Sequence, residues 1–316
     1  MKREHKQILR KIRVPFEWAG IGIAWLFFAH LPHRALFAAC DFAAAAMFFF
    51  DRRGRELALS NLRVVLGSGR VGAPTRRETL VLKRSYRNMA RTVGHAFWTC
   101  RDARARVART GEMDAAARAF LAANRPAVTV SGHLGCWEIL SQLATLEGHA
   151  MTSVAKNVGT GGMTRLLMRA RRSIGQEIVP AEGAFRPLMQ GLKSGRSLGL
   201  LVDQVVKPKN GGVWVRFFGR PMPVSAAPAF FAAKGKAPII VAWSRPLKDG
   251  RYRCETIATH PAESARDVWA CTQRCLKDLE RVIRRHPSCW VLNYRYFRKT
   301  PTPEELAQLE KRETRD

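Results

Sequence analysis

The sequence predicts an α/β fold in which a mixed, mostly parallel sheet is flanked by helices. After Pro126, short apolar runs rich in β-branched residues alternate with longer segments of helical character. Strands that alternate with helices in this way are typical of layered folds with a parallel sheet. The segment before residue 125 is rich in alanine and leucine and indicates helices. We therefore expect a helical N-terminal part followed by the sheet.

The elements of the sheet follow in order along the chain. We expect strands at 127–131, 151–155, 197–202, 213–217 and 238–243. We expect helices at 137–146, 164–173, 184–193, 225–234 and 266–285. Ligands of such sheets bind beyond the carboxyl ends of the strands. The polar segments 131–133 and 203–204 follow two of the predicted strands, so we expect a site there.

The first 50 residues differ from the rest of the chain. Six Lys and Arg residues fall within the first 13 positions, and an apolar run at 14–31 follows them. A second apolar run spans 35–50 and is interrupted by Asp41. Two buried amphipathic helices and a membrane anchor or interfacial helix fit these runs equally well. We divide the chain into this membrane-associated segment, 1–50, and a domain at 51–316.

The charge balance indicates the kind of partner. There are 54 Lys and Arg residues against 25 Asp and Glu residues, a net charge of +29. Such a surplus fits nucleic acid, an anionic membrane or an acidic carrier protein. No zinc finger or other nucleic-acid motif occurs, so we expect no nucleic-acid partner. The seven cysteines show no zinc-ligand spacing, which predicts reduced thiols and no metal site.

One short segment carries the candidate catalytic residues. His133 lies in a glycine-containing stretch directly after a predicted strand, and Glu138 follows five positions later. The two side chains can converge if His133 lies in the loop and Glu138 in the first turns of the helix. A histidine of near-neutral pKa can take a proton from a hydroxyl, and a carboxylate can orient its ring. A core histidine is the alternative, and Cys136 as nucleophile is a further one.

Several segments together resemble the lipid A biosynthesis (late, or secondary) acyltransferases of the lysophospholipid-acyltransferase-like superfamily. Residues 131–138, SGHLGCWE, resemble the family's H-x-x-x-x-(D/E) motif. Further similar segments are 60–63 (SNLR), 85–91 (SYRNMAR), 156–157 (KN), 169–175 (an R-x-x-x-G stretch), 201–204 (LVDQ) and 212–221 (GVWVRFFGRP). Cys136 stands where the family usually has asparagine. The C-terminal stretch 287–297 keeps the family's frame but lacks several of its polar residues.

The resemblance implies an acyltransferase at the cytoplasmic face of the inner membrane, acting in lipid A and lipopolysaccharide biosynthesis. It implies an acyl-carrier-protein or coenzyme A thioester as co-substrate and no other cofactor. It makes His133 the general base and Glu138 its partner. It places Arg171, or Arg169, near an acceptor phosphate or the oxyanion, Asn157 in the binding site, and Asp203 near the donor.

Three alternatives remain open at this point. The acceptor could be a glycerophospholipid, a mannosylated lipid or an amino-lipid in place of a lipid A precursor. The chain could also be a non-catalytic protein that binds membrane surfaces through its basic residues. The aromatic residues of a possible acyl tunnel are equally consistent with core packing; they are Trp214, Phe217, Phe218, Phe230 and Phe231.

Overall fold

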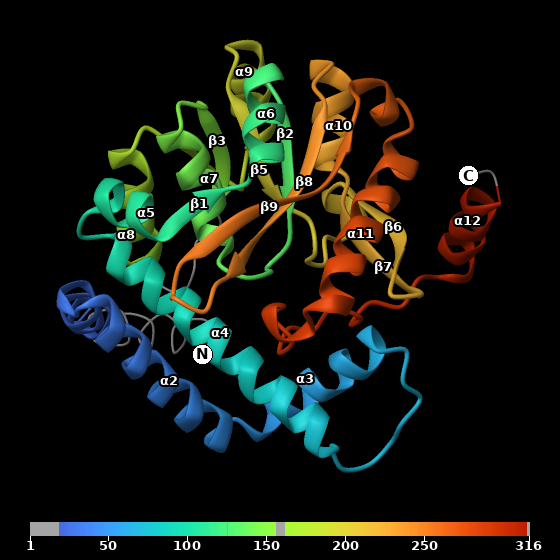
Figure 1. Ribbon diagram of the computed structural model, residues 1–316. Helices are drawn as coiled ribbons and strands as arrows, with labels where there is room; N and C mark the ends of the chain where they lie inside the picture. Colours follow the sequence, from blue (N-terminus) through green and yellow to red (C-terminus); the bar gives the residue numbers. More distant parts are fainter. Residues whose placement is uncertain (1–18, 125, 156–161, 315–316) are drawn as a thin grey trace, which may run out of the picture.

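A seven-stranded mixed sheet forms the centre of the computed structural model, which describes residues 19–124, 126–155 and 162–314 (Figure 1). Its strands are β1 (Gly111–Met113), β2 (Val128–Ser131), β3 (Met151–Ala155), β4 (Glu177–Pro180), β5 (Ser197–Leu201), β8 (Ile239–Pro246) and β9 (Tyr252–His260). They lie in the order β1-β9-β8-β2-β5-β3-β4. Only the β8–β9 pair is antiparallel. The predicted mixed, mostly parallel sheet is confirmed.

The apolar run at 213–217 does not join this sheet, contrary to expectation. It forms β6 (Gly212–Phe217), which among the described strands pairs with β7 (Arg220–Ser225) alone, in a separate antiparallel hairpin. Phe218 and Gly219 connect the two strands, and both have positive φ angles, 52° and 75°. A two-residue turn with two positive φ angles matches the twist of a hairpin, which explains why the chain reverses here.

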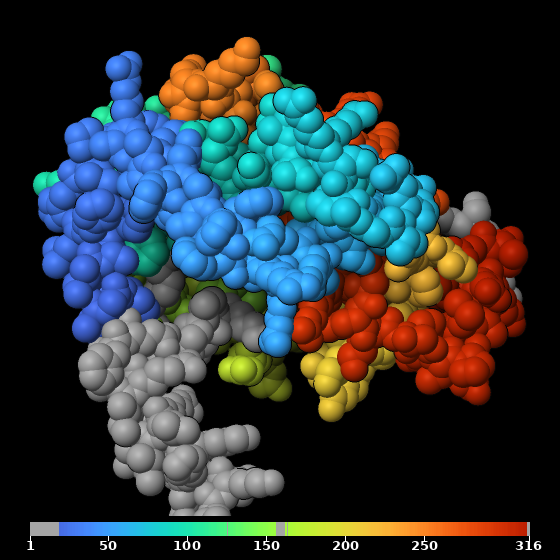
Figure 2. Space-filling model, turned by 90° about the horizontal axis from the view of Figure 1, so that it is seen from below, coloured from blue at the N-terminus to red at the C-terminus, as the bar shows by residue number. Residues whose placement is uncertain are grey.

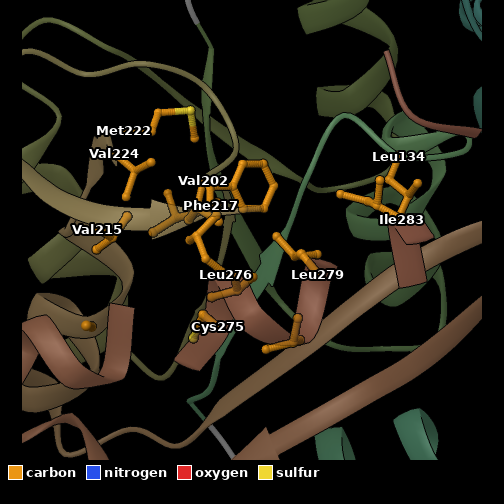
Figure 3. Packing of buried hydrophobic residues seen from close by; sticks show 14 of the residues in the cluster. Leu134, Val202, Val215, Phe217, Met222, Val224, Cys275, Leu276, Leu279 and Ile283 are labelled. Atoms are coloured by element: carbon orange, nitrogen blue, oxygen red, sulfur yellow. The ribbon is translucent and has the colours of Figure 1, made fainter. Parts of the chain in front are cut away.

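Helices cover both faces of the sheet and enclose two hydrophobic cores. One face carries α9 (Phe185–Lys193), α10 (Ala227–Gly235) and α11 (Val268–Arg285), and its core also takes in the β6–β7 hairpin (Figure 3). The other face carries α5 (Ala103–Thr110), α6 (Ala115–Ala123) and α7 (Trp137–Leu146). Beyond α7 lies α8 (Gly162–Ser173), which packs beside α5 and β4.

A helical layer lies below the sheet in the view of Figure 1. It consists of α2 (His33–Phe50), α3 (Arg52–Val65) and α4 (Arg76–Thr99). These three helices form much of the face seen from below in Figure 2. A capping box between Thr75 and Glu78 begins α4. The C-terminal helix is α12 (Pro303–Glu313), and the short 3-10 turns are η1 (Pro208–Asn210), η2 (Ala262–Ala265) and η3 (Pro287–Cys289).

The apolar N-terminal segments are helical, as expected. Ala19–His30 is a short apolar helix, and α2 is long and apolar enough to cross a membrane. This finding is weak evidence of a membrane span, because a buried core helix passes the same test. Only 17% of the α2 segment is buried, however. Residues 1–18, which hold the basic stretch, lie outside the described residues.

Candidate active site

His133 and Asp203 meet at the carboxyl ends of two adjacent strands. His133 lies in the loop after β2, and Asp203 lies two residues after the end of β5. These strands pair in parallel, with Ser131 opposite Leu201, although 70 positions separate His133 from Asp203. Because parallel neighbours end at the same edge of the sheet, residues two positions past this register face each other.

Asp203 holds both the ring and the backbone of His133. Nδ1 of His133 lies 2.7 Å from Oδ1 of Asp203, and the His133 backbone N–H donates to Oδ2 at 2.8 Å. With Nδ1–H donating to the carboxylate, Nε2 keeps its lone pair. The Gln204 amide nitrogen lies 3.2 Å from Nε2. The carboxylate is fully buried, whereas 20% of the His133 side chain is exposed. The unprotonated nitrogen can therefore accept a proton from a substrate hydroxyl.

The contact raises the pKa of His133 and lowers the pKa of Asp203, so both shifts favour the charged form of each group. Burial alone would lower the pKa of His133, but the charge and hydrogen bond of Asp203, together with the Glu138 charge, raise it above its usual value. Burial alone would raise the pKa of Asp203, but the charge of His133 and the hydrogen bonds from His133 and Trp290 lower it. The buried carboxylate therefore stabilises an imidazolium, as a general base requires.

Two glycines allow the loop around His133 to approach its neighbours. A Cβ at Gly132 would lie 3.1 Å from the Asp203 carboxyl carbon. Gly135 has φ +62°, and a Cβ there would lie 1.7 Å from the Ser244 carbonyl oxygen. A side chain at Gly135 is thus excluded by backbone conformation and by space.

The C-terminal segment completes the surroundings of Asp203. The Trp290 indole N–H donates to Oδ2 of Asp203 at 2.9 Å, so this carboxylate accepts from three donors. The indole is 1% exposed and stacks on Tyr296, with ring centroids 4.0 Å apart. The backbone around Trp290 also pairs with the His133 loop: Val291 N–H donates to the His133 carbonyl, and Gly135 N–H donates to the Cys289 carbonyl.

The helical layer fixes this C-terminal segment from the other side. The Asn61 amide donates to the carbonyls of Leu292 and Tyr294, at 2.7 Å each. Ser85 Oγ donates to the Trp290 carbonyl at 3.0 Å. The Asn88 amide donates to the Ser288 carbonyl at 2.9 Å. The polar residues of segments 60–63 and 85–91 therefore act through the 288–294 backbone on the position of Trp290.

Glu138 lies in the first turn of α7 and contacts Arg171. Its Oε2 accepts from Nη2 of Arg171 at 2.5 Å and from Nε at 3.2 Å. The two side chains are 13% and 14% exposed. The five-position spacing and the family motif predicted Glu138 as the carboxylate that orients the His133 ring. The structure corrects this: Asp203 makes that hydrogen bond, and the charge of Glu138 raises the pKa of His133. The reason is the β2–β5 pairing, which brings Asp203 to the ring.

A family of known proteins and one individual relative are similar to this chain. The model of a family described as bacterial lipid A biosynthesis acyltransferase matches residues 2–299. This chain belongs to that family. The family member named phosphatidylinositol mannoside acyltransferase from Mycobacterium tuberculosis is 26% identical over 291 residues, covering 88% of this chain and 87% of the relative. The sequence from a second strain of that organism is similar to the same extent. The chain is therefore an acyltransferase that acts in lipid metabolism.

Family membership and the apolar α2 helix together indicate a membrane-associated acyltransferase. A lipid acceptor and an acyl donor follow from the family.

The structure places the other predicted site residues of this acyltransferase in different surroundings. Arg169 is exposed on α8. The guanidinium of Arg171, expected at an acceptor phosphate or the oxyanion, is engaged by Glu138. Asn157 lies outside the described residues. Asp203 is fully buried at the His133 ring. Whether any of them binds substrate stays a prediction.

Two alternatives from the sequence lose support. Cys136 is fully buried, and burial raises the pKa of its thiol strongly, which disfavours a thiolate nucleophile. The aromatic residues of the possible acyl tunnel pack in the hydrophobic core: Phe217, Phe218 and Phe231 are buried, and Trp214 and Phe230 pack against the same cluster.

Sequence reasoning did not single out Trp290 as a site residue, and it marked Gln204 only as part of the polar segment 203–204, without a role of its own. Both occur in segments used for the resemblance, 287–297 and 201–204, so the family pattern contained the signal. Their contacts with Asp203 and His133 span 87 and 71 positions, which no local spacing reveals.

Proposed function

We propose that this protein transfers a fatty acyl chain from an acyl thioester to a hydroxyl of a lipid A precursor or a related glycolipid. The observation that carries the proposal is the His133–Asp203 pair at the carboxyl ends of β2 and β5, where the carboxylate holds Nδ1 and leaves Nε2 on the other side of the ring. Acyl carrier protein or coenzyme A carries the donor, and no further cofactor takes part. The active site faces the cytoplasm at the inner membrane.

The reaction follows from this geometry. The acceptor hydroxyl oxygen attacks the thioester carbonyl carbon, and its proton passes to Nε2 of His133. Asp203 stabilises the imidazolium that forms. The tetrahedral intermediate then collapses, the carbon–sulfur bond breaks, and the thiol leaves with the proton from His133. The products are an ester and a free thiol.

Glu138 and Arg171 have a supporting role in this proposal. An arginine has five N–H donors, and the described bonds to Glu138 use those on two of its nitrogens. Glu138 thus holds the guanidinium in a defined orientation beside the site. We assign Arg171 to the acceptor phosphate or the oxyanion, because a fixed guanidinium stabilises such charges without reorganisation.

A second acceptor has its own support. The relative from Mycobacterium tuberculosis is named for acylating a phosphatidylinositol mannoside, and it aligns over 88% of this chain. A mannosylated phospholipid also presents sugar hydroxyls beside a phosphate. The two acceptors therefore need a direct comparison.

The test combines acceptors, donors and two histidine variants. Purified protein receives a lipid A precursor or a phosphatidylinositol mannoside, each with acyl carrier protein or coenzyme A as acyl donor. We expect His133→Ala to abolish transfer and His30→Ala, an exposed histidine outside the site, to retain it. Transfer by His133→Ala would refute the mechanism. Absence of transfer to either acceptor by the wild type would refute the proposed acceptors.

Two further measurements test the acceptor and the membrane side in cells and in membrane vesicles. A lipid extract from cells that lack the protein should miss one acyl chain on the true acceptor. Protease protection in membrane vesicles should place the catalytic part on the cytoplasmic face.

A further inference from the structure

A groove of about 760 Å³ runs between α2 and α4, apart from the His133 site. Its residues fall into two chemical groups. The apolar group lies mainly on α2, and the cationic group lies mainly on α4. The lining residues are Asp41, Ala44, Ala45, Phe48, Phe49, Arg55, Leu80, Lys83, Arg84 and Arg87.

The apolar wall continues into an exposed face of α2. Phe42, Ala45 and Phe49 are spaced three and four residues apart, so they lie on one side of the helix. Phe42 and Phe49 are 79% and 74% exposed, and the adjacent Phe50 is 80% exposed. Large exposed apolar patches of this kind mark interaction surfaces.

The opposite wall carries cations that the groove's single acid does not neutralise. Asp41 is already bonded to Arg91 through two hydrogen bonds of 2.6 Å. Arg84 and Arg87 are exposed on α4, and Lys83 lies over the Phe48 ring at 5.8 Å. Arg and Lys clusters bind phosphate groups through charge-assisted hydrogen bonds.

We propose that this groove binds one anionic phospholipid of the bilayer, with an acyl chain along α2 and the phosphate at Lys83, Arg84 and Arg87. A zwitterionic lipid lacks the net charge that these cations attract. The Asp41–Arg91 ion pair lies near the middle of α2 and joins it to α4. In the proposed arrangement, α2 lies along the membrane surface with its exposed phenylalanines toward the lipid. The lipid site goes beyond acyl transfer and does not require it.

Monomeric short-chain lipids test the site without a bilayer. The full-length protein is titrated with dihexanoyl phosphatidylglycerol and with dihexanoyl phosphatidylcholine by calorimetry. We expect one binding site for the anionic lipid and binding at least about tenfold weaker for the zwitterionic one. Inorganic phosphate should bind far more weakly than the lipid, because it lacks the chain. Equal affinity for the two lipids would overturn the proposal.

Variants separate the groove from general charge attraction. Arg84→Gln/Arg87→Gln should weaken phosphatidylglycerol binding about tenfold or more. The control Lys193→Gln/Lys234→Gln removes the same charge at the ends of α9 and α10, which lead into the amino ends of β5 and β8, and should leave binding unchanged. Equal losses in the two double variants would refute a specific site.

A third variant fills the groove without changing its charge. Ala45 is exposed and lines the groove, so Ala45→Trp should block the lipid while the protein stays folded. His133→Ala should bind the lipid normally, which separates this inference from the proposed catalysis. Unchanged lipid binding in Ala45→Trp would sink the proposal. So would a change of oligomeric state in Ala45→Trp, measured by light scattering, since the groove would then be an interface between copies.

Discussion

At the scale of single residues, the active site depends on one buried carboxylate. Asp203 has no exposed surface, and three donors compensate for its desolvation: the His133 ring, the His133 backbone and the Trp290 indole. A buried carboxylate with fewer donors would have a raised pKa and would be protonated more readily. The hydrogen bonds therefore keep the charge that the imidazolium needs.

Asp203→Asn tests this charge directly. The amide keeps the size of the side chain but removes the charge that raises the pKa of His133. We expect kcat to fall by about 10²–10⁴-fold, since the neutral partner neither fixes the tautomer nor stabilises the imidazolium. The wild-type rate should rise with pH and level off above the raised pKa of His133, because only the neutral ring accepts a proton.

The pH profile gives the second readout of the same variant. Without the carboxylate, the pKa of His133 falls, so the acidic limb of the kcat profile should move to lower pH. A limb that stays in place would show that Asp203 does not control the ring. The measurement is kcat against pH for both proteins at saturating substrate.

Gly135→Ala tests the close approach of the loop to β8. The added Cβ would need a positive φ and would collide with the Ser244 carbonyl. We expect a loss of unfolding free energy of about 3 kcal/mol or more. Gly148→Ala is the matched control, because Gly148 has φ +91° but open space around a Cβ. That variant should lose only about 1–2 kcal/mol through backbone strain. Urea unfolding measures both, and equal losses would contradict the steric argument.

At the scale of elements, α3 and α4 reach the active site indirectly. Asn61, Ser85 and Asn88 donate to the backbone of 288–294, and Trp290 of that segment donates to Asp203. The segments that resemble the family outside the catalytic loop thus have a structural reason to be polar at these positions. They anchor the segment 288–294, which supports the carboxylate.

Trp290→Phe tests this support. The change removes the donor to Asp203 but keeps most of the aromatic packing. Trp269→Phe is the control, since its indole donates to the Trp214 carbonyl in the core. Trp269→Phe should lose about 0.5–1.5 kcal/mol of unfolding free energy, and Trp290→Phe about 1.5–3 kcal/mol, because its acceptor is charged. Only Trp290→Phe should lower kcat, about tenfold, with KM nearly unchanged. Equal kcat in the two variants would remove Trp290 from the positioning network.

The same elements show what the sequence can predict and where it stops. The run 151–155 and the segment 137–146 coincide with β3 and α7, because the helix has apolar residues at helical spacing and Gly148 separates the two elements. The strand β9 was not predicted, because Arg253 and Glu255 interrupt its run of apolar residues. Arg253 is exposed and Glu255 is half-buried, so this face of the strand is partly open to solvent. The strand β4 was also missed, because a four-residue edge strand carries little pattern.

The site residues also fall into those that local sequence pattern predicts and those that it does not. The position of His133 after a strand and of Glu138 in a helix followed from local pattern, and the structure has both there. The partner of the ring did not follow, because β5 lies next to β2 only after the chain has passed through β3 and β4. Pairing between distant strands is decided by the packing of the whole sheet.

At the scale of the whole molecule, a buried histidine joins the helical layer to the sheet. His95 on α4 is 1% exposed, and its Nε2 lies 3.0 Å from the Thr110 hydroxyl. Its Nδ1 faces Cys136 before α7, and its ring lies 4.9 Å from the Tyr252 ring of β9 and 6.5 Å from His33 of α2. Four parts of the fold therefore meet at one titratable ring.

The stability of the fold should depend on the protonation of His95. Burial, with the charges of His33 and Arg106, lowers its pKa to about 3. A lowered histidine pKa means that the unfolded chain takes up the proton first as the pH falls below about 6.5. The stabilisation is thus complete above this pH and is lost progressively as the pH falls toward 3. His95→Gln, which stays neutral, should show a shallower loss of Tm over this range.

His133 should contribute to stability with the opposite sign, which makes it an internal comparison. Its pKa is raised in the folded state, so the protonated ring stabilises the fold below pH 6.5 and this contribution disappears as the pH rises through the raised pKa. The Tm difference between the wild type and His133→Gln should therefore shrink as the pH rises above 6.5. The difference between the wild type and His95→Gln should instead shrink as the pH falls below 6.5. Thermal unfolding of the three proteins across this range measures both, and parallel Tm curves would show that neither ring has a shifted pKa.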